Sequence, residues 1–432
     1  MSPFQIAVFA IAIVIIVGSV IVFSMQRGSA SQSKIPIDVW GTISADVFNE
    51  FQKRINELER DSLFVNYREI SPDQFEAVLV EALASGSGPD AVIMSDDLLI
   101  KHENKLFLID YKFYTQKTFK DNFIESGEIL LRENGILGFP LTIDPLVFYW
   151  NRTILNNEGI SSPPQFWDDL LGLIPRLVKR DSASNISRAV IALGEYQNIN
   201  NAKDILISMI QQSGNNIISR NPQTGKFEAV IEQNPGFTVR PAESALNYFV
   251  QFSNPTRDVY TWNKSMPNSQ QMFTTGDLVF YIGYASERNF LIQKNPNLNF
   301  DVSVLPQSKS IPGQNIKRTV GQVHFISILN RSPKISAAFG ALNTITKPEN
   351  MRILAELTEL PSVRRDVSIS TAQSSYMDSF ASSALFSVPF IDPNVTETNK
   401  IFRDMIESVV IGNQNANRAV QRASDELKSV IR

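Results

Sequence analysis

Hydrophobic and polar residues follow two different periods along the N-terminal third of this chain. Short apolar runs at 37–40, 63–68 and 91–94 lie between turn-forming residues, as expected of buried strands. Between these runs, apolar residues recur at helical spacing over 45–60 and 72–84. Strands that alternate with helices form parallel β-α units, so the pattern predicts an α/β fold.

The later part of the chain is predicted to be richer in helices. Apolar spacing predicts a mostly helical region at 155–296, with a clear helix at 198–214, and packing helices on either side of a glycine break within 400–432. A strand-like segment at 295–307 and the segment NTITKPEN at 343–350 interrupt this pattern, and we expect each to carry the chain between two lobes.

The segment 138–152, GFPLTIDPLVFYWNR, predicts a third passage between the lobes and therefore a hinge. Pro140 and Pro145 bias the residues before them towards extended backbone, and Asp144 places a polar side chain between them. A chain that passes three times between lobes makes each lobe discontinuous in sequence. The predicted domains are lobe 1 at 36–143 and 301–345, and lobe 2 at 146–298 and 349–432.

The N-terminal residues form an apolar run from Ile6 to Phe23, which is long enough for a membrane-spanning helix. The run is longer than the core of a secretory signal and has no basic residue before it, which favours an uncleaved anchor. Small residues at 28–30 keep cleavage open as the alternative. We therefore expect a transmembrane anchor or signal segment at 4–26 and a flexible linker at 27–35.

Composition excludes several classes of function. The net charge is −4 over 432 residues and the basic residues are dispersed, which argues against nucleic-acid binding. The absence of cysteine excludes disulfides, thiol nucleophiles and cysteine-bound metals. The two histidines, His102 and His324, have no partner at ligand spacing, so we predict no metal site, no catalytic triad and no cofactor.

A series of short motifs is more specific in combination than any one of them alone. The motifs are IDVW at 37–40 before a long helix, Pro89-Asp90 before an apolar strand, the passage at 138–152, SSPPQFWDDL at 161–170, MFTTGDLVFYIG at 272–283, VGQVHFISILNRSPKISAAFGAL at 320–342, and Leu360-Pro361 with Arg364. Because these motifs occur in this order, the chain resembles the extracellular solute-binding proteins of ABC importers. Within them, it resembles the carbohydrate-type family 1, which includes the maltodextrin-binding protein. The resemblance covers most of the chain and implies an α/β, two-lobe periplasmic-binding-protein-like (type II) fold with a hinge, here with an added N-terminal transmembrane helix.

The resemblance also implies a function. A member of this family captures a small polar solute outside the cell, here a sugar or polyol, and delivers it to an ABC permease by hinge closure, without catalysis. We expect a monomer, anchored in the cell membrane by one span with its lobes on the extracytoplasmic side. Two alternatives stay open: a two-lobe domain that senses a solute or binds a partner protein, and an exported glycan-cleaving enzyme, which would need two carboxylates across its cleft.

Candidate ligand-binding residues lie at predicted strand ends and at the passage between the lobes. Trp40 ends the first strand, where its indole can stack on a sugar ring or pack in a core. Asp96 and Asp97 follow the third strand and Asp144 lies in the passage, where a carboxylate can accept sugar hydroxyls or cap a turn. Gln322 begins a strand beside the predicted cleft, and its amide can form paired hydrogen bonds.

Two tyrosines are the candidate stacking residues of lobe 2. Tyr196 follows a strand-like segment, and Tyr284 ends the strand DLVFYIG. Relatives commonly carry aromatic residues at the positions of Met94, Ala285 and Asn399, so the resemblance implies fewer stacking surfaces for long glucans in this chain.

Overall fold

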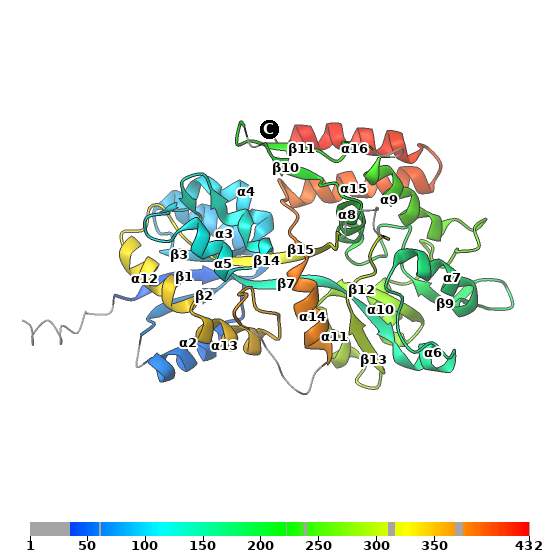
Figure 1. The fold of residues 1–432 in the computed structure, drawn as a ribbon, viewed down its shortest axis with the longest axis horizontal. Coiled ribbons are helices and arrows are strands. Elements are labelled where there is room, and N and C mark those ends of the chain that lie inside the picture. Colours follow the sequence, from blue (N-terminus) through cyan, green and yellow to red (C-terminus); the bar gives the residue numbers. More distant parts are fainter. Residues whose placement is uncertain are drawn as a thin grey trace, which may run out of the picture.

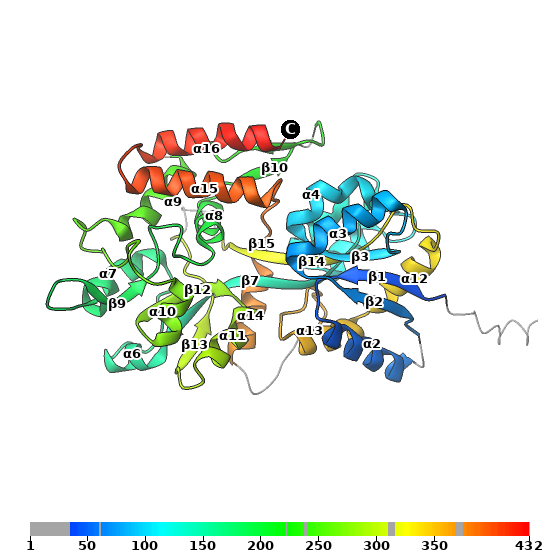
Figure 2. The ribbon, with the colours of Figure 1, turned by 180° about the vertical axis from the view of Figure 1, so that it is seen from behind.

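The computed structural model describes residues 35–431 except 60–61, 222, 235, 237–239, 310–315 and 368–374. Within these ranges the chain forms two lobes that lie side by side and share one sheet (Figures 1 and 2). The predicted anchor at 4–26 and nearly all of the predicted linker lie outside the described residues. No helix of the described part combines the length and the apolar character needed to cross a bilayer.

The shared sheet has ten strands, and two of them join the lobes. The strand order is β2-β1-β3-β14-β7-β12-β9-β8, with β13 also beside β7 and β15 beside β14. Strand β7 (Phe139–Asn151) is buried along its whole length. Its first half pairs with β14 (Thr319–Ile328) and its second half with β12 (Leu278–Tyr284). Strand β7 lies within the segment 138–152, for which the sequence analysis expects a passage between the lobes.

Lobe 1 is the half whose buried core includes Phe48, Ile93 and Leu342. Its strands β1, β2 and β3 are parallel and alternate with helices, as the sequence pattern predicts. The elements are β1 (Ile37–Gly41), α2 (Ala45–Glu59), β2 (Val65–Glu69), α3 (Pro72–Ser85), β3 (Ala91–Ser95), η1 (Asp96–Leu98), α4 (Leu99–His102), η2 (Glu103–Lys105), β4 (Ile109–Asp110), α5 (Gln116–Asn122), η3 (Glu125–Leu130), β5 (Leu131–Arg132), β6 (Gly135–Ile136), α12 (Ile335–Ile345) and α13 (Pro348–Thr358).

Lobe 2 is the half whose buried core includes Phe148, Leu206 and Phe280. It is richer in helices, and α14 packs on β7 near the junction of the lobes (Figure 1). The elements are α6 (Arg152–Asn157), α7 (Trp167–Leu177), β8 (Lys179–Arg180), β9 (Ile186–Ile191), α8 (Ala202–Gln212), β10 (Ile218–Arg220), β11 (Phe227–Ala229), α9 (Pro241–Val250), η4 (Gln251–Ser253), α10 (Ser269–Thr275), α11 (Glu287–Lys294), β13 (Phe300–Ser303), α14 (Ser375–Leu385), β15 (Ser387–Val388), α15 (Val395–Val410) and α16 (Ala416–Val430).

Local sequence explains where several of these helices begin and end. Helix α3 begins at Pro72, whose fixed φ suits a first helical turn, and it ends before Gly86, which has the left-handed φ of 73°. Helix α15 begins after Asn394, whose side chain accepts hydrogen bonds from the backbone N–H groups of Thr396 and Glu397. Such capping satisfies backbone groups that a helix leaves unpaired.

Two of the predicted lobe boundaries differ from the observed packing. Residues 301–303 belong to β13, which pairs with the second half of β7, and Val302 lies in the lobe 2 core, so lobe 1 does not resume at 301. Helix α13 packs on α2, and Met351 and Leu354 lie in the lobe 1 core, so lobe 2 does not resume at 349. The first difference arises because an extended segment can add an edge strand to the sheet it has just left instead of crossing between lobes. The second arises because residues 343–350 complete α12 and begin α13 within lobe 1.

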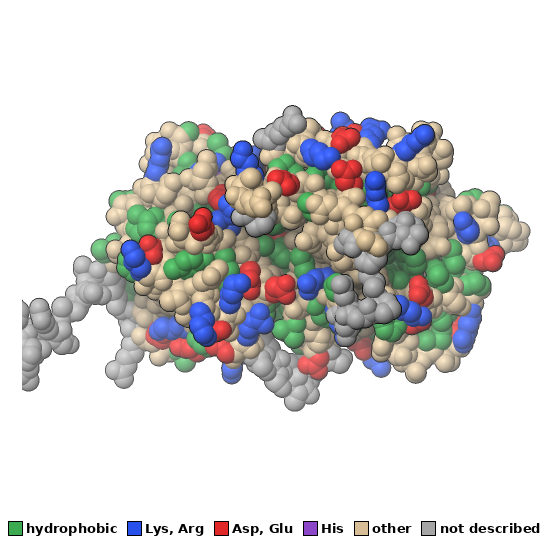
Figure 3. All heavy atoms as spheres, turned by 45° about the horizontal axis from the view of Figure 1, so that its top comes forward, with side chains coloured by type: hydrophobic (Ala, Val, Ile, Leu, Met, Phe, Trp, Pro, Cys, Tyr) green, Lys and Arg blue, Asp and Glu red, His purple; other side chains and the backbone are tan. Residues whose placement is uncertain are grey.

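Charged side chains of both signs are interspersed on the face of the molecule in Figure 3, and no continuous basic stripe crosses it. This distribution agrees with the dispersed charge in the sequence. Non-specific binding to nucleic acid needs a clustered positive surface, which this face does not present.

Candidate functional site

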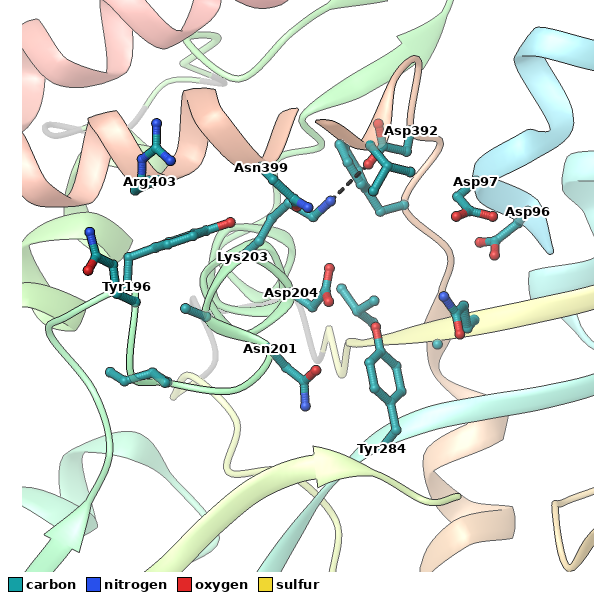
Figure 4. A pocket seen from close by; sticks show the side chains of 18 residues that line it. Asp96, Asp97, Tyr196, Asn201, Lys203, Asp204, Tyr284, Asp392, Asn399 and Arg403 are labelled. Atoms are coloured by element: carbon teal, nitrogen blue, oxygen red, sulfur yellow. Dashed lines mark hydrogen bonds and ion pairs between the residues drawn. The ribbon is translucent and has the colours of Figure 1, made fainter. Parts of the chain in front are cut away.

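A cavity of about 560 Å³ lies where the two lobes and the joining strand β14 meet, which we call the first cavity. Its size falls in the range of small-molecule sites in proteins. Polar side chains surround it, and Figure 4 shows them converging from several elements. The lining residues are Asp96, Asp97, Tyr196, Gln197, Ile199, Asn201, Ala202, Lys203, Asp204, Tyr284, Val320, Gly321, Gln322, Phe390, Asp392, Val395, Asn399 and Arg403.

The lobe 1 wall of the first cavity is one short turn at the carboxyl end of β3. Asp96 is buried there, and its Oδ1 accepts a hydrogen bond from the Val323 backbone N–H at 3.2 Å. The Ser95 hydroxyl donates to Asp97. Burial, with the adjacent Asp97 charge, raises the pKa of Asp96 well above its ordinary value. This wall therefore offers two fixed carboxyl groups to a ligand.

The lobe 2 wall includes the first turn of α8, where a buried ion pair fixes two segments together. Lys203 Nζ lies 2.9 Å from Asp392 Oδ2, and the two side chains are only 11% and 3% exposed. The Thr398 hydroxyl, at the start of α15, donates to the same carboxylate at 2.8 Å. Because both partners are shielded from water, this ion pair holds the 390–392 segment against α8.

Asp204 and Tyr284 form a second polar pair in this wall. Burial raises the pKa of Asp204, although the neighbouring Lys203 charge and a hydrogen bond with the Tyr284 hydroxyl oppose the shift. Burial, followed by the Asp204 charge, raises the pKa of Tyr284 well above its ordinary value. The end of β12 is held in place because the Tyr149 hydroxyl donates to the Tyr284 carbonyl at 2.7 Å and the Tyr284 N–H donates to Glu287 at 2.9 Å.

Strand β14 forms the floor between the two walls. Gly321 lies so close to β15 that a Cβ atom added there would stand 2.7 Å from the Ser387 side chain. A glycine is therefore required for β15 to pair with β14, and that pairing brings the segment from Phe390 to Asp392 to the cavity. The next residue, Gln322, also lines the cavity.

Five of the seven candidate ligand-binding residues come together around the first cavity, although they are spread over 227 positions of sequence. The five are Asp96, Asp97, Tyr196, Tyr284 and Gln322. The fold therefore provides one place at which all five side chains can act together.

Trp40 and Asp144 lie outside this lining. Trp40 is partly buried against the lobe 1 core, and the Arg68 guanidinium lies 4.7 Å from its ring centre. Trp40 lies opposite Val92 of the neighbouring strand β3, four positions before Asp96, so the end of β1 stops short of the turn that lines the cavity. Asp144 is buried, and its Oδ1 accepts a hydrogen bond from the Ser286 backbone N–H at 3.0 Å, at the beginning of α11. Burial raises the pKa of Asp144 to about 7.

Seven polar lining residues were not among the candidates of the sequence analysis. They are Gln197, Asn201, Lys203, Asp204, Asp392, Asn399 and Arg403. A signal for three of them existed in the run NAKD at the start of the predicted helix at 198–214, because polar residues at the start of a helix can face a ligand. Asp392 gives no local signal, since its role depends on a partner 189 residues away.

The positions at which relatives carry aromatic residues have three different surroundings here. Asn399 lines the first cavity, whereas Met94 and Ala285 are buried in the cores. Among the described residues, no group of three or more acidic or histidine side chains is arranged to hold a metal ion.

A family model described as bacterial extracellular solute-binding protein matches residues 47–377. The chain therefore belongs to this family, as the sequence motifs predict. Curated relatives include binding proteins of Brucella abortus (strain 2308) and Brucella suis biovar 1 (strain 1330), each 22% identical over 148 residues. The matched stretch covers 34% of this chain and spans only 35% of the length of these relatives.

Solved structures show the same fold over nearly the whole chain. A cyclic alpha-maltosyl-1,6-maltose binding protein from Arthrobacter globiformis is 14% identical, with a TM-score of 0.73 over 92% of this chain and 99% of that one. A solute-binding protein from Thermotoga lettingae, bound with alpha-D-tagatose, is 14% identical, with a TM-score of 0.65 over 92% and 100%. A substrate-binding protein from Listeria monocytogenes, in complex with cycloalternan, is 16% identical, with a TM-score of 0.65 over 91% and 98%. The two-lobe α/β fold is thus shared with proteins that bind solutes.

Proposed function

We propose that this protein binds a small polar solute, a sugar or polyol, in the first cavity and delivers it to an ABC permease without changing it chemically. The observation that carries the proposal is the arrangement of carboxyl, amide and phenol groups from both lobes around one cavity. Sugar hydroxyls both donate and accept hydrogen bonds, so they suit a lining that mixes acceptors such as Asp97 with donors such as Asn399. The sugar ligands of the related Thermotoga and Listeria proteins support the same class of solute.

Each candidate residue has a role in this proposal. Asp96 and Asp97 accept hydroxyls from the lobe 1 side, Gln322 forms paired hydrogen bonds at the floor, and the rings of Tyr196 and Tyr284 cover apolar parts of the solute. Trp40 and Asp144, which lie outside the cavity lining, act indirectly, by packing the end of the lobe 1 sheet and by fixing α11.

Transport would follow from closure of the lobes about β7 and β14. A solute shifts the equilibrium towards a closed form only by contacting both lobes in that form, and the first cavity has lining residues from both. The N-terminal segment at 4–26 would anchor the protein in the cell membrane with its lobes outside, near the permease, which raises the effective concentration of the loaded form.

The test is thermal stabilisation of the purified full-length protein by a panel of monosaccharides, disaccharides, polyols, amino acids and peptides. A solute present at 100 times its dissociation constant should add about 2.7 kcal/mol to the stability of the folded state. A shift with sugars or polyols that is lost in both Asp97→Ala and Tyr284→Ala supports the proposal. A shift with amino acids or peptides alone would contradict the assigned class of solute.

A further inference from the structure

A second cavity of about 350 Å³ adjoins the first, and Phe390 lines both. It also lies between the lobes, because η3 and β5 of lobe 1 form one side and α8 with the β10–β11 hairpin of lobe 2 form the other. Asp204 faces the first cavity and Gln211 the second. These two residues are seven positions apart on α8, so they share a face of the helix about 10 Å apart along its axis.

The walls of the second cavity are mainly apolar. The apolar side chains that matter here are Ile129 and Leu131 from lobe 1, Ile217 and Phe227 from lobe 2, and Pro389 with Phe390 from the segment after β15. The first cavity, in contrast, is lined mostly by polar groups. A solute that extends past Phe390 therefore passes from a polar to an apolar environment.

The charged residues at the second cavity already have partners. Arg132 Nε donates to Glu103 Oε1 at 2.6 Å, and Lys120 lies 2.7 Å from Glu128. Arg318 Nη2 lies 3.7 Å from Glu125 Oε1, and Arg220 Nη2 lies 3.6 Å from Glu103 Oε1. The cavity therefore favours an uncharged group, because a charged one would lose its hydration without gaining a free opposite charge.

Unlike the charged residues at the second cavity, Gln211 has a side-chain atom without a hydrogen-bond partner among the described residues. Its side chain is only 6% exposed, and its Oε1 atom has no hydrogen-bond partner among the described residues. This oxygen has almost no accessible surface, so the Gln211 amide has to turn towards the cavity to meet a ligand donor. Because a buried acceptor without a donor costs about 1–3 kcal/mol, a ligand donor that meets it would be favoured.

We propose that the second cavity binds the aglycone of a glycoside: an uncharged, apolar ring that carries one hydrogen-bond donor directed at Gln211 Oε1. The inference rests on the proposed function, because the sugar part of the same solute occupies the first cavity. Aromatic rings suit the site because Phe390 and Phe227 offer ring surfaces against which a flat group can pack.

The test compares methyl, phenyl and 4-hydroxyphenyl glycosides of glucose, galactose and mannose by calorimetric titration of the full-length protein. For the sugar that binds, we expect the phenyl glycoside to bind at least tenfold more tightly than the methyl glycoside. The 4-hydroxyphenyl glycoside should bind a further threefold to tenfold more tightly, since its hydroxyl supplies the missing donor.

Three variants separate the contributions. Gln211→Met removes the acceptor while keeping the shape of the side chain. It should abolish only the gain in affinity of the 4-hydroxyphenyl glycoside over the phenyl glycoside. Ile129→Trp fills the second cavity from lobe 1, and it should abolish both gains while leaving the methyl glycoside affinity within about twofold. Gln322→Met is the matched control in the first cavity, and it should weaken all three glycosides alike.

The outcomes distinguish this inference from the function on which it rests. If the methyl glycosides bind but the aryl glycosides bind no better, or if Gln211→Met leaves the aryl series unchanged because water already satisfies Oε1, the inference is overturned and sugar binding stands. If no sugar and no glycoside binds, the proposed function fails and this inference fails with it.

Discussion

The two walls of the first cavity are built in different ways. Lobe 1 contributes adjacent residues, Asp96 and Asp97, from one turn that follows β3. Lobe 2 contributes side chains from α8, β12, α15, the loop with Tyr196 and the segment after β15. The lobe 2 wall is thus larger and more elaborate than the lobe 1 wall. We therefore expect lobe 2 to bind the solute first and lobe 1 to add contacts when the lobes close.

The buried ion pair gives the largest effect expected from the lobe 2 wall. Lys203→Met leaves the Asp392 carboxylate buried without its cation, and we expect a loss of about 3–5 kcal/mol in the free energy of unfolding. Urea denaturation at pH 7 measures this loss. The double variant Lys203→Met/Asp392→Asn should recover much of it, because no unpaired charge remains.

A matched control for this variant is Lys309→Met, also in lobe 2. Lys309 lies 3.2 Å from Asp169, but both side chains are about half exposed, so its removal should cost less than about 1 kcal/mol. Equal losses for the two lysine variants would contradict the view that burial makes the Lys203 pair important.

Asp144, on the joining strand β7 and in neither wall, should make the free energy of unfolding depend on pH. Asp144 has a pKa of about 7 in the folded protein against an ordinary 3.8, so between these values the folded state holds a proton that the unfolded state releases. Its contribution is complete below about pH 4 and is lost as the pH rises through about 7, by about 4 kcal/mol at most.

In the Asp144→Asn variant the side chain at this position cannot ionise, so the variant should not lose this stability as the pH rises. The free energy of unfolding of the variant, minus that of the wild type, should therefore increase between pH 4 and pH 8 in urea titrations. Asp73→Asn, at an exposed position of α3, is the control for removing one carboxylate. A difference that stays constant with pH would show that burial of Asp144 does not have this consequence.

Tyr284→Phe tests the lobe 2 wall through a single hydroxyl. The ring remains, but Asp204 loses its hydrogen-bonding partner and the solute loses a polar contact, so we expect about tenfold weaker sugar binding by calorimetry. Tyr260→Phe removes a hydroxyl from lobe 2 away from the first cavity and should leave binding unchanged.

Asp97→Asn tests the smaller lobe 1 wall and should have the smallest effect, about threefold in affinity, since the amide keeps one acceptor oxygen. The same titrations as for Tyr284→Phe provide the direct comparison. A larger loss for Asp97→Asn than for Tyr284→Phe would reverse the order of the two walls and indicate that lobe 1 binds the solute first.

The sequence alone determined the features that depend on local order. Hydrophobic period and turn residues predicted the β-α alternation of lobe 1, and the prolines and apolar residues of 138–152 predicted the strand that joins the lobes. The turn with Asp96 and Asp97 was predictable for the same reason, because it follows a strand whose end could be read from its apolar run.

The tertiary structure decided which of these elements face the cavity. Trp40 lies near the end of a strand as predicted, but its register opposite Val92 keeps it away from the turn with Asp96 and Asp97. Asp144 lies in the predicted passage, but its carboxylate accepts a hydrogen bond from α11 instead of lining the cavity. Lys203 and Asp392 meet across 189 residues, and Gly321 allows the approach of β15 that brings Asp392 there. Pairings of this kind depend on strand order and close packing, which no local pattern of hydrophobic and polar residues encodes.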